Sequence, residues 1–342
     1  MKAIRNKNYG LQLLRMILSF WVVLYHCLTK SKNALILNFI KKMFHVPTFF
    51  FISFYFLFPI IKRVNTSKMI LRLERLFIPY IIWPFITWSI NNFLFIKYHK
   101  SRLNRFLSKS ELFEQLIVGR IFFKQFWYLF NLLFFSISFF ILSLIIKINT
   151  FLKIMKFFAI VSYFLQYSSY NYIYFDKFKE SISHSIGHFV EILPIAITAF
   201  ILNDKDIPNK LAKRRYKAII YSFLGIYFIY KYEIFKKIKK YGNKYNFNGF
   251  DKNIFATFLF IFFYLIPINL IKSYKIKTII ELVSNYTQGI YCIHPLTDYY
   301  GKKLFHFKTT FKGCLIIYFL SYLISFIGSK MSFNTKFKFL FI

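Results

Sequence analysis

Long, nearly unbroken blocks of apolar residues dominate the chain. Most of these blocks run for about 17 to 22 residues, the length that a helix needs to cross a hydrocarbon core of roughly 30 Å at 1.5 Å per residue. A soluble domain instead breaks its apolar residues into stripes or alternating positions. The pattern therefore predicts an all-α fold, a polytopic transmembrane helical bundle with about ten transmembrane helices.

The predicted spans cover residues 11–28, 44–61, 76–96, 126–147, 151–168, 183–202, 216–230, 254–274, 280–297 and 313–329. The fifth, seventh and ninth are short or polar, so re-entrant segments or other bounds are the alternative for these three. Residues 97–124 are too polar to span, and Leu112, Leu116 and Ile117 predict a short amphipathic helix on the membrane surface. Because no long linker and no internal repeat divides the chain, residues 1–342 are interpreted as a single membrane-embedded domain.

The composition is 57% hydrophobic and 23% aromatic, with a formal net charge of +36. The Lys and Arg residues lie in short loops between apolar blocks without any nucleic-acid-binding motif, so we expect membrane lipids and not nucleic acid as their partners. Lys and Arg divide almost equally between the two predicted sides, so the positive-inside rule does not fix the orientation. Only the dense clusters at 62–75 and 205–217 favour a cytoplasmic N-terminus.

The three cysteines, Cys27, Cys292 and Cys314, lie in or beside apolar blocks and have no CxxC partner. We therefore expect neither a metal site nor a disulfide framework. The basic, apolar N-terminus resembles a signal peptide, but Arg15 interrupts its apolar stretch and no small-residue cleavage site follows. We interpret it as a retained first helix.

Ionisable residues inside the spans are candidate functional residues, because each costs about 2.5–3.5 kcal/mol on insertion scales. Arg15 and His26 of the first span are 11 residues apart, hence about 20° apart around a helix and about 16 Å along it. Both side chains therefore project from the same face of the helix. A snorkelling arginine and a histidine satisfied by a neighbouring helix remain the structural alternative.

Arg72 and Arg75 precede the third predicted span and are three residues apart, so they aim at a common target. Two guanidinium groups offer bidentate hydrogen bonds to phosphate or carboxylate. Simple positive-inside anchoring explains their position equally well.

His184, His188 and Glu191 fall at helical positions i, i+4 and i+7 near the start of the sixth span. An interfacial hydrogen-bond cluster, or a lining for a polar acceptor, is favoured over a metal site, which would need a further ligand. Tyr291 and His294 likewise share one face, close to Asp298.

These segments, in this order, resemble the acyltransferase 3 family of membrane acyltransferases, whose members include O-acetyltransferases of cell-wall and surface polysaccharides. The resemblance rests on LLRMILSFWVVLYH, VPTFFFISFYF, RLERLFIPY, FWYL and TQGIYCIHPL, which together span nearly the whole chain. It implies about ten helices, a cytoplasmic N-terminus, no metal and no bound cofactor. It also implies a multi-pass protein of a bacterial inner membrane, with other glycan-assembly proteins as further partners.

The resemblance implies transfer of an acetyl or other short acyl group from acyl-CoA to a hydroxyl of a cell-surface or lipid-linked carbohydrate. Arg15, Arg72 and Arg75 would bind the donor's phosphates, and His26 would act as general base, with a covalent acetyl-histidine as a variant. The residues expected to contact the acceptor or stabilise the oxyanion are Ser53, Trp127, Glu191, Tyr291 and His294.

Two departures from the family's pattern bear on packing. Phe54 follows Ser53 where the family usually has Ser-Gly, and Ala199 stands where a glycine is common. A transporter or flippase for a lipid-linked glycan is the alternative function, since intramembrane charges suit it too. We see neither the paired broken helices nor the repeat symmetry expected of such a transporter. An inactive relative serving as a scaffold is a third alternative.

Overall fold

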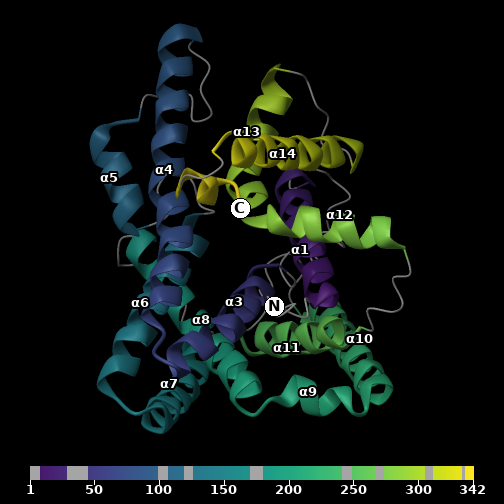
Figure 1. Cartoon of the computed structure of the whole chain (residues 1–342). Coiled ribbons are helices and arrows are strands. Elements are labelled where there is room, and N and C mark those ends of the chain that lie inside the picture. Colours follow the sequence, from purple (N-terminus) through teal and green to yellow (C-terminus); the bar gives the residue numbers. More distant parts are fainter. Residues whose placement is uncertain are drawn as a thin grey trace, which may run out of the picture.

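The computed structural model describes residues 8–28, 45–98, 107–118, 126–169, 180–240, 249–266, 273–304, 311–332 and 336–342, and these residues form helices and no strands. Figure 1 shows the long α4 beside α5 and α6, with α12, α13 and α14 on the other side of the molecule. The elements are α1 (Tyr9–Leu28), α3 (His45–Lys62), α4 (Thr66–Tyr98), α5 (Lys109–Val118), α6 (Trp127–Ile145), α7 (Ile148–Ser169), α8 (Glu180–Asp204), α9 (Ile207–Ala212), α10 (Arg215–Lys240), α11 (Gly249–Leu265), α12 (Tyr274–Asn285), α13 (Thr287–Leu304), α14 (Phe311–Met331) and the 3-10 helix η4 (Lys336–Leu340).

Most apolar blocks form the helices predicted for them, with ends within about three residues for α1, α3, α6, α7, α8 and α14. The short helix expected within residues 97–124 is α5. Three described helices are long and apolar enough to cross a membrane, namely Tyr9–Cys27, Trp127–Ile145 and Phe311–Met331, and Val46–Lys62 and Lys252–Leu265 are shorter apolar helices. The structure thus supports a membrane protein, and the count of ten spans stays a prediction.

The third predicted span began too late. The helix starts at Thr66 and continues through Pro79 and Pro84 to Tyr98, so Arg72 and Arg75 belong to α4 and do not precede it. Hydropathy missed this first part because its charged residues lower the local average, although nothing between Thr66 and Leu76 breaks a helix.

The ninth predicted span, 280–297, was wrong as one helix. It is divided between α12 and α13 at Tyr286, whose φ and ψ of −102° and 9° leave the helical region. The N–H of Tyr286 donates a hydrogen bond to the carbonyl of Val283, three residues earlier. The next helix, α13, begins at Thr287. The eighth prediction, 254–274, was also too long, because α11 ends at Leu265 and α12 begins separately at Tyr274.

An aromatic core joins α3, α6 and α8 around Phe54. This ring is fully buried and lies 5.9 to 6.2 Å from the rings of Phe50, Phe135, Phe139 and Phe200. Aromatic pairs at such separations add about 0.5–1.5 kcal/mol each beyond their buried area. The bulk that distinguishes Phe54 from a glycine is therefore accommodated by neighbouring rings.

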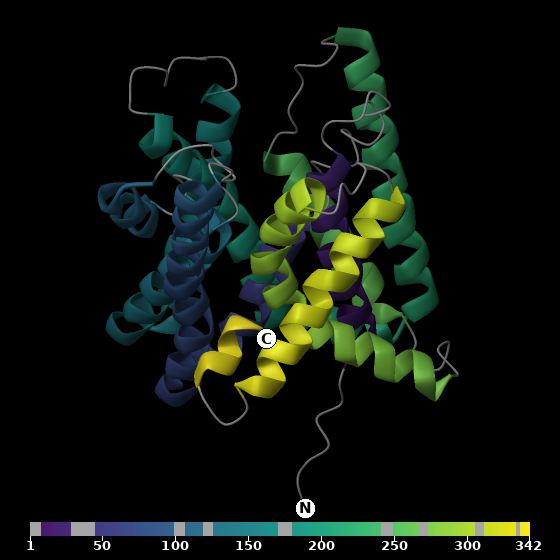
Figure 2. The ribbon, with the colours of Figure 1, turned by 90° about the horizontal axis from the view of Figure 1, so that it is seen from above.

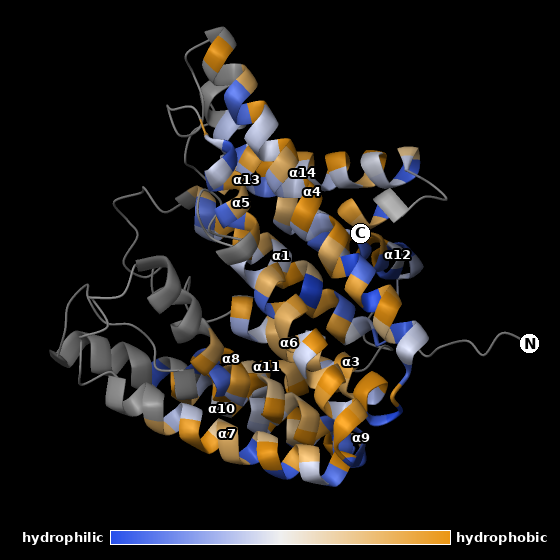
Figure 3. Cartoon of the chain, turned by 90° about the vertical axis from the view of Figure 1, so that its left-hand side faces the viewer, coloured by the Kyte–Doolittle hydropathy of each residue, from blue (hydrophilic) through white to orange (hydrophobic). Residues whose placement is uncertain are grey.

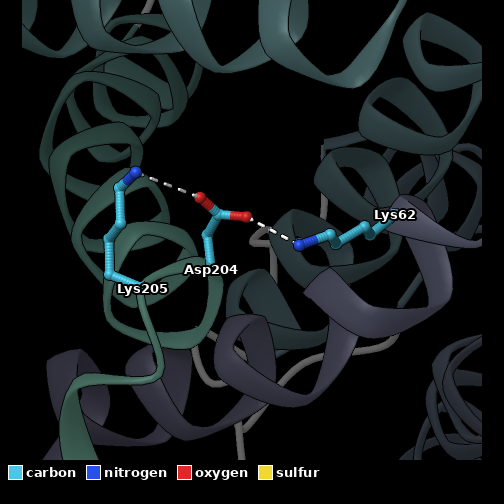
Figure 4. Close-up of polar contacts among 3 residues, drawn as sticks. All are labelled: Lys62, Asp204 and Lys205. Atoms are coloured by element: carbon cyan, nitrogen blue, oxygen red, sulfur yellow. Dashed lines mark hydrogen bonds and ion pairs between the residues drawn. The ribbon is translucent and has the colours of Figure 1, made fainter. Parts of the chain in front are cut away.

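Polar contacts fasten the ends of several helices at one end of the bundle. Figure 4 shows Asp204, at the end of α8, between Lys62, at the end of α3, and Lys205. Its carboxylate is 2.9 Å from the ammonium nitrogen of Lys62 and 4.0 Å from that of Lys205. Nearby in the sequence, Asn203 donates to the carbonyl of Tyr55 at 3.1 Å. The C-terminal ends of α3 and α8 therefore meet.

The beginning of α1 is fixed to the end of α11. Asn8 caps α1 by accepting from the N–H of Leu11 (3.0 Å), and its amide donates to the carbonyl of Tyr264 (3.0 Å). The Tyr264 hydroxyl in turn donates to Asn209 of α9 (3.0 Å). Gly10 lies so close to the Phe263 carbonyl that a Cβ there would overlap it.

Large apolar side chains cover much of the outer surface of the bundle. Phe157 on α7, Phe223 on α10 and Phe319 on α14 are all exposed. Figure 3 shows hydrophobic residues dominating the helices around α3, α6 and α7. Such a surface suits contact with lipid tails, since water-soluble monomers rarely expose large contiguous apolar areas.

Candidate active site

Two histidines meet where α1 packs against α13. The ring centroids of His26 and His294 are 5.0 Å apart, with the planes inclined by 39°. His294 is fully buried, and its Nδ1 lies 3.2 Å from the carbonyl oxygen of Ile290. Because a carbonyl can only accept, this bond places the proton on Nδ1 and leaves Nε2 as the basic nitrogen. The two imidazoles are therefore neighbours, and Nε2 is the nitrogen of His294 that can accept a proton.

The same two helices also bring Arg15 to Thr287. The guanidinium Nη2 of Arg15 donates to the Thr287 hydroxyl at 3.1 Å, and Thr287 donates to the carbonyl of Ser284 at 3.1 Å. Since Thr287 and His294 are seven residues apart on α13, the arginine contact and the histidine pair are separated by about 10 Å along that helix. The pair of helices α1 and α13 thus carries the Arg15–Thr287 contact at one level and the His26–His294 pair at another.

Tyr128 of α6 connects the arginines with the histidine pair. It interacts electrostatically with Arg15 and with Arg72. Its ring centroid is 5.2 Å from that of Tyr291, which is 6.0 Å from that of His294. A continuous series of contacts therefore runs from the arginines to the histidine pair.

Arg72 is held inside the bundle by two hydroxyl groups. Its Nη2 donates to Ser53 of α3 at 2.7 Å and its Nε donates to Ser136 of α6 at 3.2 Å. Ser53, which was expected to contact the acceptor or the oxyanion, therefore holds an arginine in this structure. The remaining N–H groups of the guanidinium retain the capacity to bind an anion.

Arg75 lies one helical turn further along α4 and is exposed. Its guanidinium carbon is 5.5 Å from the ring centroid of Phe339 in η4. Its carbonyl accepts a hydrogen bond of 2.7 Å from Gln288, the residue after Thr287. Arg15 also interacts electrostatically with Arg75, and both Arg15 and Arg72 interact with Tyr128, so the three predicted arginines lie in one region of the bundle.

Two other predicted residues have different surroundings. Trp127 packs against Phe50, with ring centroids 5.8 Å apart. Glu191 forms an ion pair of 2.9 Å with Lys252 of α11. The side chains of His184 and His188 lie outside the described residues, and the residues that the structure does describe contain no group of three or more metal-ligating side chains.

Sequence reasoning did not single out Thr287 and Ser136, the two hydroxyls that accept from Arg15 and Arg72. Thr287 stands at the start of the TQGIYCIHPL segment, but the break before it was not predicted. Ser136 is a small polar residue in an apolar block, as are many others in this chain. The available signal was the requirement that a buried arginine have hydrogen-bond acceptors, which identifies no particular residue.

Comparison with known families gives one match. A family model described as an acyltransferase domain, the acyltransferase 3 model, matches residues 8–330, nearly the whole chain. Searches of the curated proteins and of the solved structures returned no match. The matched region includes both histidines and all three arginines, and leaves η4 outside.

Proposed function

Because this chain belongs to the acyltransferase 3 family and is therefore a membrane acyltransferase, we propose that it transfers an acetyl or other short acyl group from acyl-CoA to a hydroxyl of a carbohydrate. The carbohydrate would be lipid-linked or part of the cell surface. The protein would be a multi-pass component of a bacterial inner membrane, working beside other glycan-assembly proteins.

A single observation carries this proposal. One pair of helices, α1 and α13, presents the His26–His294 pair at one position and the Arg15–Thr287 contact about 10 Å away. A coenzyme A thioester has the same division of chemistry, with phosphates at one end and a reactive carbonyl at the other. The arginine group would bind the phosphates, and the pantetheine arm would extend past Tyr128 toward the histidines.

The chemistry at the histidines is general-base catalysis. The imidazole of His26 would remove the proton from the acceptor hydroxyl as its oxygen attacks the thioester carbonyl carbon. The carbon–sulfur bond then breaks, and the coenzyme A thiolate takes the proton from the imidazolium. His294, with its proton held on Nδ1, would orient His26 or accept the charge that develops on it. Tyr291 would contact the oxyanion or the acceptor.

The test is release of coenzyme A from acetyl-CoA by purified protein in liposomes, with and without crude lipid-linked glycans. We expect the wild type to release coenzyme A and His26→Ala to lose about 10²–10⁴-fold of that rate, the usual contribution of a general base. Lys153→Ala, an exposed lysine on α7, serves as the matched control and should retain full activity.

The same assay separates this proposal from the transporter alternative. The family match favours an enzyme. If neither acetyl-CoA nor succinyl-CoA were consumed by the wild type while a labelled lipid-linked glycan crossed the bilayer, the acyl-CoA proposal would be wrong.

A further inference from the structure

The segment of residues 336–342 is wedged between α4, α13 and α14. Trp83 of α4 donates its indole N–H to the carbonyl of Leu340 at 3.0 Å. The Phe341 backbone and ring approach Gly289 and Gly328 so closely that a Cβ at either glycine would overlap them. Figure 2 shows this segment beside the end of α14 and next to α4. The segment is therefore a fixed part of the bundle.

This packing places two cations around one aromatic ring. The Arg75 guanidinium carbon and the Lys338 ammonium nitrogen lie 5.5 and 5.8 Å from the ring centroid of Phe339. Within the described part of the chain neither cation forms an ion pair with a carboxylate. Arg15 adds a third positive charge, because it interacts electrostatically with Arg75. Like charges gathered in this way repel one another, and an anion bound beside them would relieve that repulsion.

The chemistry of the group selects a phosphate ester. A guanidinium lying over a ring keeps its N–H edge available for a bidentate phosphate contact, and a lysine ammonium binds phosphate as a point charge. A nucleotide supplies such phosphates together with a flat base, and the base can stack on the exposed Arg75 guanidinium, since the Phe339 ring is itself buried. A lipid headgroup supplies the phosphate alone.

The position of Arg75 relative to the candidate active site favours a nucleotide over a lipid headgroup. The backbone of Arg75 is bonded to Gln288, adjacent to Thr287, and Thr287 is bonded to Arg15 on the helix that carries His26. A molecule whose phosphates lie at Arg75 and Lys338 can therefore extend along α13 toward the histidine pair. We propose that Lys338 and Phe339 form, with Arg75, the binding site for the phosphorylated nucleotide end of the acyl donor. This inference rests on the proposed function, since it names the part of the donor that this segment recognises.

The test measures binding of adenosine 3′,5′-bisphosphate to the purified full-length chain by titration calorimetry. We expect Lys338→Gln to weaken binding about tenfold, the effect of losing one charge-assisted contact, and Lys338→Arg to retain it. The matched control is Lys330→Gln, because Lys330 also lies over an aromatic ring, that of Phe326 at 5.9 Å, and should bind as the wild type does. The Lys338→Gln variant should raise the KM for acetyl-CoA and leave that for S-acetylpantetheine, which lacks the nucleotide, unchanged.

Three outcomes would overturn the inference. Binding of the bisphosphate that is the same in Lys338→Gln and wild type would exclude Lys338 from the site. Equal binding of glycerol 3-phosphate, lost in the same variant, would assign the cations to lipid headgroups. A KM raised equally for both donors would show that the segment acts only through the packing of the bundle. A wild type that binds the bisphosphate through Lys338 but transfers no acyl group would instead contradict the proposed function alone.

Discussion

The hydroxyl of Thr287 is the acceptor that the structure provides for Arg15. Thr287 is buried, and its neighbour across the helix pair carries a full positive charge in a largely apolar bundle. Hydrogen bonds to charged groups contribute about 1.5–3 kcal/mol, more than bonds between neutral groups. Removing the Thr287 hydroxyl therefore tests whether α1 and α13 pack with Arg15 next to Thr287.

We expect Thr287→Val, which preserves shape and removes the hydroxyl, to destabilise the protein by about 1.5–3 kcal/mol. The measurement is the shift of the thermal unfolding midpoint in one detergent. Thr278→Val on α12 is the matched control, because the Thr278 hydroxyl is exposed and donates only to Tyr274 of its own helix. An equal shift for the two variants would contradict the Arg15–Thr287 contact.

At the same scale, the sequence identified the charged and aromatic members of the candidate site but not their partners. Arg15 and His26 stood out because ionisable residues are rare in apolar blocks. The pairing of His26 with His294, and of Arg72 with Ser53, depends on which helices are neighbours. No periodicity within a single helix contains that information.

Between elements, the closest approach of α1 to α11 depends on Gly10. A Cβ at this position would overlap the carbonyl of Phe263, which is backbone and cannot rotate away. The first helix would have to shift, together with the Asn8 cap that fixes its start. Because α1 carries both Arg15 and His26, such a shift would reach the candidate site.

We expect Gly10→Ala to destabilise the protein by about 1–3 kcal/mol, the usual cost of overpacking, and to reduce coenzyme A release as α1 moves. Gly225→Ala is the control, since the added Cβ would meet only the ring of Phe258, a side chain able to turn aside. Thermal unfolding and activity of the two variants provide the comparison. Equal stability of both would show that α1 and α11 are not in close contact at Gly10.

Element boundaries were predicted well where hydropathy changes sharply and poorly where it does not. The ends of α1, α6 and α14 coincide with charged or polar loops. The break between α12 and α13 occurs at Tyr286, not at a proline or glycine, and it lies within a continuous, moderately polar stretch. The backbone conformation of one residue makes the break, and the next residue, Thr287, contacts Arg15 of α1, a neighbour that hydropathy does not reveal.

For the whole molecule, the Lys62–Asp204 contact constrains the topology of the chain. The turn after α3 and the turn after α8 are in contact, and so must face the same compartment. Counting Lys and Arg on the two sides gave nearly equal totals. The contact therefore places the two turns on one side of the membrane, and which side that is stays a prediction, because the positive-inside rule does not fix it.

We expect Arg63→Cys and Lys205→Cys to be labelled together by a membrane-impermeant maleimide. Both positions are exposed and adjoin the paired residues. With a cytoplasmic N-terminus, both should react only after the membrane is permeabilised. The wild type provides the background, since Cys27, Cys292 and Cys314 are buried. Labelling of one position in intact cells and not of the other would contradict the fold.

The bond between Arg15 and Thr287 joins residues 272 positions apart in the sequence. A ribosome adding about 5–20 residues each second reaches Thr287 some tens of seconds after the first helix has been made. During that interval Arg15 and His26 have been synthesised, but their partners on α13, Thr287 and His294, have not. Assembly of the site therefore has to follow the synthesis of α13, and a nascent chain that does not yet include Thr287 cannot form this contact.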